Sequence, residues 1–359
     1  METPSLPAIL PRAAAAAVER AAAVAPVVVL LGARQTGKTT LVRSLPLLAG
    51  RPYLTLDDFD LRMQAAADPE SLVARAPALI LDEVQRARDL LIAIKRAVDR
   101  EPARAPGRFV LTGSANLLML ERIGETLAGR AVYVTLWPFT RRERLGLGRT
   151  GAWSALLAAP FAAWRAALAA GGEPAEDWRA AARRGGLLNQ TELSRDVGIV
   201  QPQVHRFLNL MEASYQAIRL PAYAVNRTRR LIKAPKLYWS DTGLALYLAG
   251  ETEPRGPHLE NLVLADLLAW RDTQARRPEV RYWRTATGLE VDFVVETPAR
   301  LLPVEIKAAA RVTPADVKGL EAFLDEYPDR TDGGLLLHGG ADAFPLTRRV
   351  LAAPWWWVC

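Results

Sequence analysis

Residues 27–40 read VVVLLGARQTGKTT, and this stretch decides the fold of the first part of the chain. The run before Gly32 holds only apolar residues, which is typical of a strand buried on both faces of a parallel sheet. Residues 40–45 are predicted to form a helix. Between them, GARQTGKT at 32–39 fits the pattern G-x-x-x-x-G-K-T in the strand–loop–helix setting that a phosphate-binding loop requires.

The residue types of this loop explain how it would hold a nucleotide. Gly32 and Gly37 permit tight turns that aim backbone N–H groups at phosphates, and the following helix N-terminus adds partial positive charge. Lys38 is expected to reach the β- and γ-phosphates, and the Thr39 hydroxyl to bind Mg²⁺. ATP and Mg²⁺ are therefore the predicted cofactors. The residues predicted to contact the nucleotide are Gly32, Ala33, Arg34, Gln35, Thr36, Gly37, Lys38, Thr39 and Thr40.

A second apolar run, ALIL at 78–81, ends in two acidic residues, Asp82 and Glu83. A carboxylate at the end of a buried strand is costly unless it faces a cation. Asp82 is therefore predicted to complete the magnesium site, and Glu83 to act as the base that polarises the attacking water. The remaining strands of the same parallel sheet are predicted at 53–56, 109–112 and 132–136.

Two further residues are candidates for catalytic roles. Ser114 follows the predicted strand at 109–112 and is expected to sense the γ-phosphate. Asn116 is the second choice for that role, and an ordinary turn cap is the alternative explanation. Arg130 precedes the last predicted strand and is a candidate arginine finger that acts on a neighbouring subunit's nucleotide. A solvated arginine is the alternative there.

Composition limits the classes of function. The chain has 359 residues, enough for two or three domains, and 50% of them are hydrophobic. A formal charge of +7 and a pI near 9.7 favour a polyanionic partner. Cys359 is the only cysteine, which excludes disulfides within the chain and cysteine-rich zinc sites. No apolar run reaches about 18 residues, so we expect a cytoplasmic protein with no membrane partner.

Residues 189–212 have the pattern of a helix-turn-helix, with a turn at Gly198 and Pro202 at the first position of the second helix. The predicted apolar stripe of that helix consists of Val204, Phe207, Leu208 and Met211. Its opposite face offers residue types that contact DNA, and the basic segment after it, which also includes Lys233 and Lys236, could be a wing against phosphates. The residues predicted to contact DNA are Gln203, Arg206, Arg227, Arg229 and Arg230. A helical linker with solvated charges, or a helix pair that binds protein, is the alternative.

The stretch EVDFVVETPARLLPVEIK at 290–307 predicts a hairpin with its turn at 297–300. Counting back from that turn gives three facing pairs: Glu296 with Leu301, Asp292 with Glu305, and Glu290 with Lys307. Two carboxylates face to face repel each other by roughly 3 kcal/mol, so something must offset the charge. Solvent, a raised pKa, a nearby cation and a divalent metal all remain open at this point.

Glu260 lies on the apolar stripe of a helix predicted at 259–270, where a carboxylate should be paired or functional. It could join the hairpin residues in a second metal site. In this interpretation Asp292 and Glu305 hold Mg²⁺, Glu260 supports the ion, and Lys307 positions water or stabilises phosphate charge. A surface ion-pair cluster is the alternative, because the pattern D-(x)n-E-x-K by itself is weak.

These motifs together resemble a prokaryotic family of AAA-type P-loop ATPases, and the resemblance spans nearly the whole chain. The segments that carry it are GARQTGKT at 32–39, LILDEVQ at 79–85, LTGSANLL at 111–118, LAGR at 127–130, LLNQTELSRDVG at 187–198, APKLYWSDTGLALYL at 234–248, LEN at 259–261, EVDF at 290–293 and VEIK at 304–307. It implies an α/β fold with an AAA-type parallel-sheet ATPase domain at 1–150. A helical and winged-helix domain at 151–250 and an α/β domain at 251–359 that resembles PD-(D/E)xK nucleases would follow.

The resemblance also implies roles and partners. Lys38, Thr39, Asp82 and Glu83 would serve ATP hydrolysis, and the acidic set around Asp292 would serve a nuclease-like site. A homo-oligomer is expected, with a hexameric ring as one form. The predicted function is a Mg²⁺-dependent ATPase that binds DNA and remodels it, branched DNA included. The alternatives are a nucleotide-gated switch that binds a protein partner, and a nuclease that ATP regulates.

Overall fold

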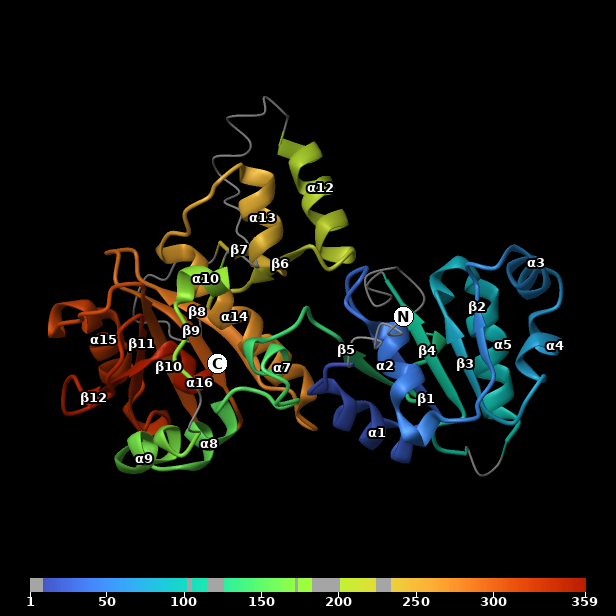
Figure 1. Ribbon diagram of the computed structural model, residues 1–359, viewed down its shortest axis with the longest axis horizontal. Helices are drawn as coiled ribbons and strands as arrows, with labels where there is room; N and C mark the ends of the chain where they lie inside the picture. The colour runs from blue at the N-terminus through green and yellow to red at the C-terminus, as the bar shows by residue number, and fades with distance from the viewer. Residues whose placement is uncertain (1–8, 102–104, 115–125, 172–173, 183–200, 224–233) are drawn as a thin grey trace, which may run out of the picture. The chain divides into compact units, whose positions relative to one another are not determined.

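The computed structural model describes residues 9–101, 105–114, 126–171, 174–182, 201–223 and 234–359 (Figure 1). This part of the chain forms two compact units, and each is described by itself. The first unit runs up to Gly113 and resumes in the stretch that ends at Thr150. The second unit includes the residues from Gly151 to Cys359. None of the described helices is both long and apolar enough to cross a membrane.

A five-stranded parallel sheet forms the centre of the first unit. Its strands are β1 (Val27–Leu31), β2 (Tyr53–Thr55), β3 (Leu79–Asp82), β4 (Phe109–Gly113) and β5 (Ala131–Thr135). They lie in the order β2-β3-β4-β1-β5, so β1 pairs with β4 on one side and β5 on the other. All residues of β1 are buried, which accounts for its unbroken apolar sequence. The parallel sheet predicted from the sequence is confirmed.

Helices precede, connect and follow these strands. They are α1 (Ala14–Val24), α2 (Lys38–Ser44), α3 (Phe59–Ala67), α4 (Pro69–Val73), α5 (Arg88–Asp99) and α7 (Arg141–Arg144). Side chains alternate along a strand, so Val28 and Leu30 share one face of β1. Both belong to one apolar cluster with Val18 of α1 and Val42 of α2. The loop between β1 and α2 is therefore anchored at both ends by buried residues.

The second unit contains a six-stranded mixed sheet. Its strands are β8 (Glu279–Arg284), β9 (Glu290–Glu296), β10 (Leu301–Lys307), β11 (Gly334–His338), β12 (Phe344–Pro345) and β13 (Val350–Pro354). The order is β12-β13-β11-β10-β9-β8. Strand β11 pairs parallel with both β10 and β13, whereas β9 pairs antiparallel with both β8 and β10. The predicted C-terminal α/β domain is present, and its likeness to nucleases stays a prediction.

Helices α14 (Gly256–Thr273) and α15 (Lys318–Glu326) contact the middle of this sheet. Phe323 of α15 meets Trp283 of β8 edge-on, with ring centroids 5.6 Å apart. Shorter helices complete the unit: α8 (Trp153–Ala158), α9 (Trp164–Ala169), α10 (Trp178–Ala182) and α16 (Trp355–Val358). The first tryptophan of each is buried, Trp355 of the terminal Trp355–Trp356–Trp357 run among them. These tryptophans therefore contribute to the core.

The β9–β10 hairpin has the predicted turn, because Leu301 pairs with Glu296 and the Thr297 N–H donates to the Arg300 carbonyl at 3.0 Å. The ladder of this hairpin, all of which the structure describes, ends where Val304 pairs with Phe293. The predicted pairs Asp292–Glu305 and Glu290–Lys307 therefore do not form in it. A register shift on the other side of β9 gives the reason. Trp283 pairs with Val291 although Arg281 pairs with Val294, so β9 bulges at 292–293.

The middle of the chain contributes α12 (Gln201–Ala213), the antiparallel pair β6 (Ala217–Leu220) and β7 (Lys236–Trp239), and α13 (Thr242–Ala249). Leu208 of α12 is buried as predicted, but Phe207 is 56% exposed. Neighbouring residues on a helix point about 100° apart, and α12 contacts mainly β6, so only a narrow stripe is covered. The first helix of the predicted helix-turn-helix lies outside the described residues. The winged-helix assignment therefore stays a prediction.

Candidate functional site

The loop at 32–39 requires glycine at its first position. Gly32 has φ +152°, and a Cβ atom there would lie 2.2 Å from the carbonyl oxygen of Leu136. Gly37 at the other end has φ +89° and forms the N-cap of α2. Both backbone conformations disfavour other residues. The two glycines that the motif demands are thus demanded by the local geometry as well.

Lys38 is the first residue of α2, and its side chain folds back over the loop. It is 6% exposed, and its ammonium donates to the carbonyl oxygens of Gly32 at 3.0 Å and Ala33 at 2.7 Å. Burial lowers the pKa of Lys38, while the carboxylates of Glu83 and Asp82 act in the opposite direction. The positive charge is therefore held at the loop by weak neutral acceptors, which a phosphate oxygen can replace.

Thr39 and Asp82 lie side by side, as predicted for a magnesium site. The Thr39 hydroxyl donates to Asp82 Oδ2 at 3.1 Å, and Tyr53 also donates to this oxygen. The other oxygen, Oδ1, accepts from the hydroxyl of Thr112 and from the Glu83 N–H. A hydroxyl and a carboxylate are oxygen ligands of the kind Mg²⁺ prefers. These residues therefore fit the predicted ion.

Tyr53 shows how strongly the Asp82 carboxylate is enclosed. Its hydroxyl donates to Asp82. Burial is the larger cause and this hydrogen bond the next of a pKa for Tyr53 that is raised to about 12. The tyrosine therefore remains a hydrogen-bond donor to this carboxylate at neutral pH.

Glu83 has a strained backbone at the point where the predicted base is needed. Its φ of 57° lies in the left-handed region that non-glycine residues rarely adopt. Its carboxylate accepts a hydrogen bond from the side-chain amide of Gln85. Strain of this kind is concentrated at functional sites, so the geometry is in keeping with the role predicted for Glu83.

The other two catalytic candidates remain predictions. Ser114 follows β4 directly and is half-buried, whereas Asn116 lies outside the described residues. Arg130 forms a two-pronged ion pair with Asp99 of α5, with Nε–Oδ1 at 2.6 Å and Nη2–Oδ2 at 2.9 Å. Its guanidinium is therefore engaged within its own chain. An arginine finger at this position would have to exchange Asp99 for a phosphate.

A cavity of about 860 Å³ adjoins the phosphate loop. Ile9, Leu10 and Pro11 line it together with Gln35 and Gly37 of the loop, and Thr40 and Leu41 of α2 also contribute. Ligand sites of this kind are mostly apolar with a few polar groups. The cavity therefore offers space for the base and ribose of a nucleotide whose phosphates occupy the loop.

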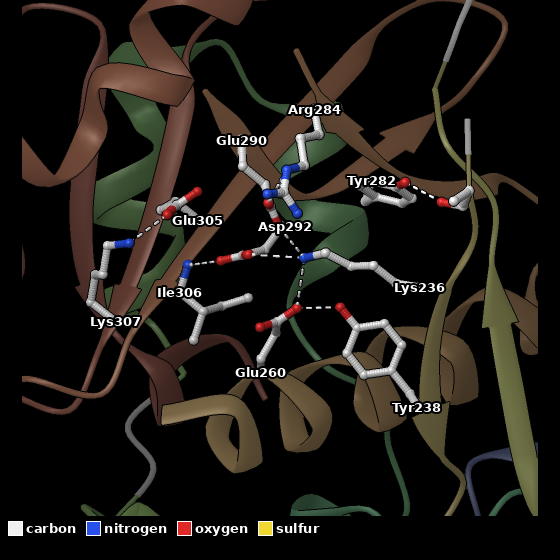
Figure 2. A network of polar contacts seen from close by, with 11 residues as sticks. Lys236, Tyr238, Glu260, Tyr282, Arg284, Glu290, Asp292, Glu305, Ile306 and Lys307 are labelled. Carbon is white, nitrogen blue, oxygen red and sulfur yellow. Dashed lines mark hydrogen bonds and ion pairs between the residues drawn. The ribbon is translucent and has the colours of Figure 1, made fainter. Parts of the chain in front are cut away.

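The second acidic cluster lies in the second unit around an ammonium that the sequence interpretation did not place there. Figure 2 shows Lys236 Nζ between Glu260, Glu290 and Asp292. The distances are 3.1 Å to Glu260 Oε1 and 3.4 Å to Asp292 Oδ1. Burial alone would lower the pKa of Lys236, but the carboxylates outweigh burial and raise it. Lys236 is therefore a permanent cation in this cluster.

Asp292 and Glu305 do not share one partner. The second oxygen of Asp292 accepts the Ile306 N–H at 2.9 Å, a donor that the bulge leaves free of the ladder. Glu305 turns toward Lys307, with Nζ–Oε1 at 2.6 Å (Figure 2). Burial raises the pKa of Glu305 to about 7, although Lys307 opposes this shift. Burial, Glu260 and Glu305 likewise raise the pKa of Asp292.

This arrangement does not fit the metal predicted for Glu260, Asp292 and Glu305. Among the described residues, no group of three or more His, Cys, Asp or Glu side chains is placed to hold a metal ion. Lys236 bonds two of the three predicted ligands, and Lys307 bonds the third. Of the alternatives for offsetting the charge of these carboxylates, the contacts match a nearby cation. The principal cation is Lys236.

Comparison with known proteins identifies the relatives of this chain. Residues 24–145 match a family described as an AAA domain. Residues 178–255 and 255–358 match two domains of unknown function, DUF8612 and DUF4143. Two uncharacterized mycobacterial proteins, Rv2008c of Mycobacterium tuberculosis and Mb2031c of Mycobacterium bovis, are each 32% identical over 381 residues. The alignment covers 96% of this chain and 83% of each relative.

The chain belongs to the family of Rv2008c and Mb2031c. Its first unit is an AAA-type domain with a P-loop ATPase fold. The family match agrees with the parallel sheet and the loop geometry, so this member of the Rv2008c family is an ATPase-like enzyme. A solved structure, the Walker-type ATPase PABY2304 of Pyrococcus abyssi, is 14% identical with a TM-score of 0.36 and covers 66% of this chain and 94% of its own.

The DNA-contact residues predicted for this Rv2008c-family chain are largely beyond the described residues. Arg227, Arg229 and Arg230 lie in the segment 224–233, of which nothing is described. Arg206 is exposed on α12. The helix position of Gln203 is described, but its side chain is not. DNA contact thus remains a prediction.

Sequence reasoning missed Arg12, which supports the phosphate loop from outside the motif. Its guanidinium donates to the carbonyl oxygens of Thr36 at 2.7 Å and Trp137 at 2.5 Å. It also pairs with Glu143, with Nε–Oε1 at 3.1 Å. A signal for Glu143 was present, because Thr140 and Glu143 have the spacing of a capping box and form one. No local pattern marked Arg12 itself.

Proposed function

We propose that the first unit binds Mg-ATP at the loop 32–39 and hydrolyses it. The observation that carries this proposal is the 3.1 Å contact between the Thr39 hydroxyl and Asp82 Oδ2, beside a lysine whose ammonium lies over the loop. The AAA-domain match over 24–145 supports the same activity. The adjoining cavity supports a complete nucleotide as the ligand, since it continues from the loop past Gly37 and Thr40.

Each residue of this site has its own role in the proposed reaction. Lys38 exchanges its two carbonyl contacts for phosphate oxygens, and Thr39 and Asp82 hold the metal. Mg²⁺, when bound, supplies positive charge that offsets the charge of the phosphates. Glu83 accepts the proton of the attacking water, and its strained backbone fixes where that carboxylate lies. Arg12 keeps the loop in place through the Thr36 carbonyl.

Thr39→Val tests the metal ligand directly, since it removes the hydroxyl and keeps the shape. We expect turnover of ATP to require a much higher Mg²⁺ concentration, because one of the metal's ligands is lost. Thr39→Ser is the matched control, because it retains the hydroxyl and should retain the Mg²⁺ dependence of the native chain. Equal Mg²⁺ dependence in the native chain and Thr39→Val would remove Thr39 from the site.

We further propose that the output of this ATPase is the remodelling of DNA, with branched DNA included, by a homo-oligomer. The formal charge of +7 and the exposed Arg206 support a polyanionic partner. ATP turnover should rise on addition of single-stranded, duplex or branched DNA, and binding should weaken steeply with salt. Turnover that ignores DNA, with no binding at low salt, would favour the nucleotide-gated switch that binds protein. DNA cleavage that Asp292→Ala abolishes would favour the ATP-regulated nuclease.

A further inference from the structure

Lys236 joins three structural elements of the second unit through one charged atom. It is the first residue of β7, and its Nζ contacts Glu260 on α14 and both Glu290 and Asp292 on β9. The ring of Tyr282 on β8 lies 5.4 Å from the same atom. The pairing of β7 with β6 fixes the backbone position of Lys236, since Lys236 pairs with Leu220. The ammonium is therefore held in one place from several sides.

The charges around Lys236 are those of a cation site. Three carboxylates face Nζ, and their side chains are between 12% and 26% exposed. Arg284 approaches Glu290 at 3.4 Å but is itself 47% exposed, so it neutralises the outer edge only. Tyr238 donates its hydroxyl to Glu260 Oε1, the same oxygen that contacts Lys236. Without Lys236, the carboxylates of Glu260 and Asp292 would face each other with no cation between them.

We propose that Lys236 permanently occupies the position that a divalent cation would take, so that the second unit holds its acidic cluster together without a metal. Two further acceptors are already used, because Asp292 Oδ2 accepts the Ile306 N–H and Glu305 Oε1 accepts from Lys307, whereas Glu305 Oε2 is buried with no hydrogen-bond partner among the described residues. The lysine is an intrachain substitute for the metal and pins β7 to α14 and β9. The proposal does not depend on ATP binding by the first unit.

Terbium luminescence tests this proposal, because Tyr238 and Tyr282 lie next to the ammonium and can transfer excitation to a Tb³⁺ ion in its place. All samples carry Asp82→Asn, which removes the carboxylate of the magnesium site in the first unit. With Lys236 present, we expect no tyrosine-sensitised Tb³⁺ binding that depends on Asp292. Lys236→Met keeps the length of the side chain and loses the charge, and it should gain one Tb³⁺ per chain. Adding Asp292→Asn should abolish that gain.

Two control variants make the result specific. Lys236→Arg retains the charge and should bind no Tb³⁺ in the cluster. Lys318→Met removes an exposed lysine from the start of α15 and should also leave Tb³⁺ binding unchanged. The proposal is overturned if the chain with Lys236 binds Tb³⁺ in a manner that Asp292→Asn abolishes. It is equally overturned if folded Lys236→Met gains no Tb³⁺.

A measurement on the native chain keeps the proposal testable even if Lys236→Met does not fold. Acetic anhydride labels accessible amines, and mass spectrometry gives the rate for each lysine. We expect Lys236 to react much more slowly than the exposed Lys318, and millimolar Mg²⁺ to leave both rates unchanged. A Lys236 that reacts as fast as Lys318, or one that Mg²⁺ exposes to the reagent, would overturn the proposal.

Discussion

The two acidic sites of this chain use the same residue types for opposite purposes. Each has a buried aspartate, a lysine and a tyrosine that donates to a carboxylate: Asp82, Lys38 and Tyr53 in one, and Asp292, Lys236 and Tyr238 in the other, where the tyrosine bonds Glu260. In the first site the lysine contacts backbone carbonyls, and Asp82 is paired with the Thr39 hydroxyl. In the second the lysine contacts the carboxylates themselves.

The difference in partners gives the two lysines opposite pKa shifts. Burial lowers the pKa of Lys38, because its carbonyl partners do not compensate for lost hydration. Carboxylates overcome the effect of burial at Lys236 and raise its pKa. A lysine held by carbonyls remains available to an incoming phosphate, whereas a lysine held by carboxylates is already neutralised. The partner of the lysine, more than the presence of acids, therefore distinguishes the two sites. The site of Lys38 is open to a ligand, and the site of Lys236 is closed to one.

Removing the lysine of the open site should have the largest effect. We expect Lys38→Ala to lower ATP turnover by at least about 10³-fold, because its charge offsets charge that develops on the phosphates. Phosphate release in Mg²⁺ measures this. Lys95→Ala, a half-buried lysine of α5 outside the loop, is the matched control and should turn over ATP as the native chain does. Loss of less than tenfold in Lys38→Ala would contradict its assigned role.

Replacing the predicted base, Glu83, should slow ATP hydrolysis without weakening ATP binding. Glu83→Gln should reduce turnover by roughly 10²–10⁴-fold, since general base catalysis contributes about that much. ATP binding should be retained, because Glu83 is not among the residues that hold phosphate or metal. Equilibrium binding of a fluorescent ATP analogue and single-turnover hydrolysis measure the two quantities on the same sample. A parallel loss of affinity and rate would make Glu83 a binding residue.

The lysine of the closed site should matter for stability instead. Lys236→Met should lower the free energy of unfolding by about 3 kcal/mol, because it leaves buried carboxylates without their cation. Urea unfolding measures the change. Adding Glu260→Gln should recover part of the loss, since one of the opposing charges is then removed. Stability losses that simply add in the double variant would show that the two residues do not interact.

The last effect concerns the pH dependence of stability. Burial raises the pKa of Glu305 from 4.5 to about 7, so the folded chain retains a proton that the unfolded chain has already lost in this range. Stability should therefore fall as pH rises from about 4.5 to about 7, and the fall should be complete above the folded pKa. Glu305→Gln should flatten this part of the profile. Urea unfolding at several pH values measures it, and an unchanged slope would assign the proton elsewhere.

Sequence patterns predicted the first site well because its parts are local. The glycines, Lys38 and Thr39 follow one strand, and Asp82 ends another strand of the same parallel sheet. Parallel strands bring their carboxyl ends to one edge, so the topology itself brings Thr39 and Asp82 together. The hairpin turn at 297–300 was equally predictable, since it depends on the turn residues alone.

Other features could not be predicted because their partners lie far apart in sequence. Lys236 is 24 residues from Glu260 and 56 from Asp292, and the sequence pattern grouped it with the basic residues before it in a wing against phosphates. The bulge at 292–293 follows from packing between β8 and β9, which no turn signal marks. Arg12 reaches a carbonyl 125 residues away for the same kind of reason.

The central claim is that Lys38, Thr39 and Asp82 together hold Mg-ATP. Isothermal titration of the purified chain with ATP tests it most directly, in Mg²⁺ and in excess EDTA, alongside Asp82→Asn. The account predicts one nucleotide per chain in Mg²⁺, and much weaker binding after chelation or in Asp82→Asn. Binding that is absent in Mg²⁺, or that is equal in all three samples, would contradict it.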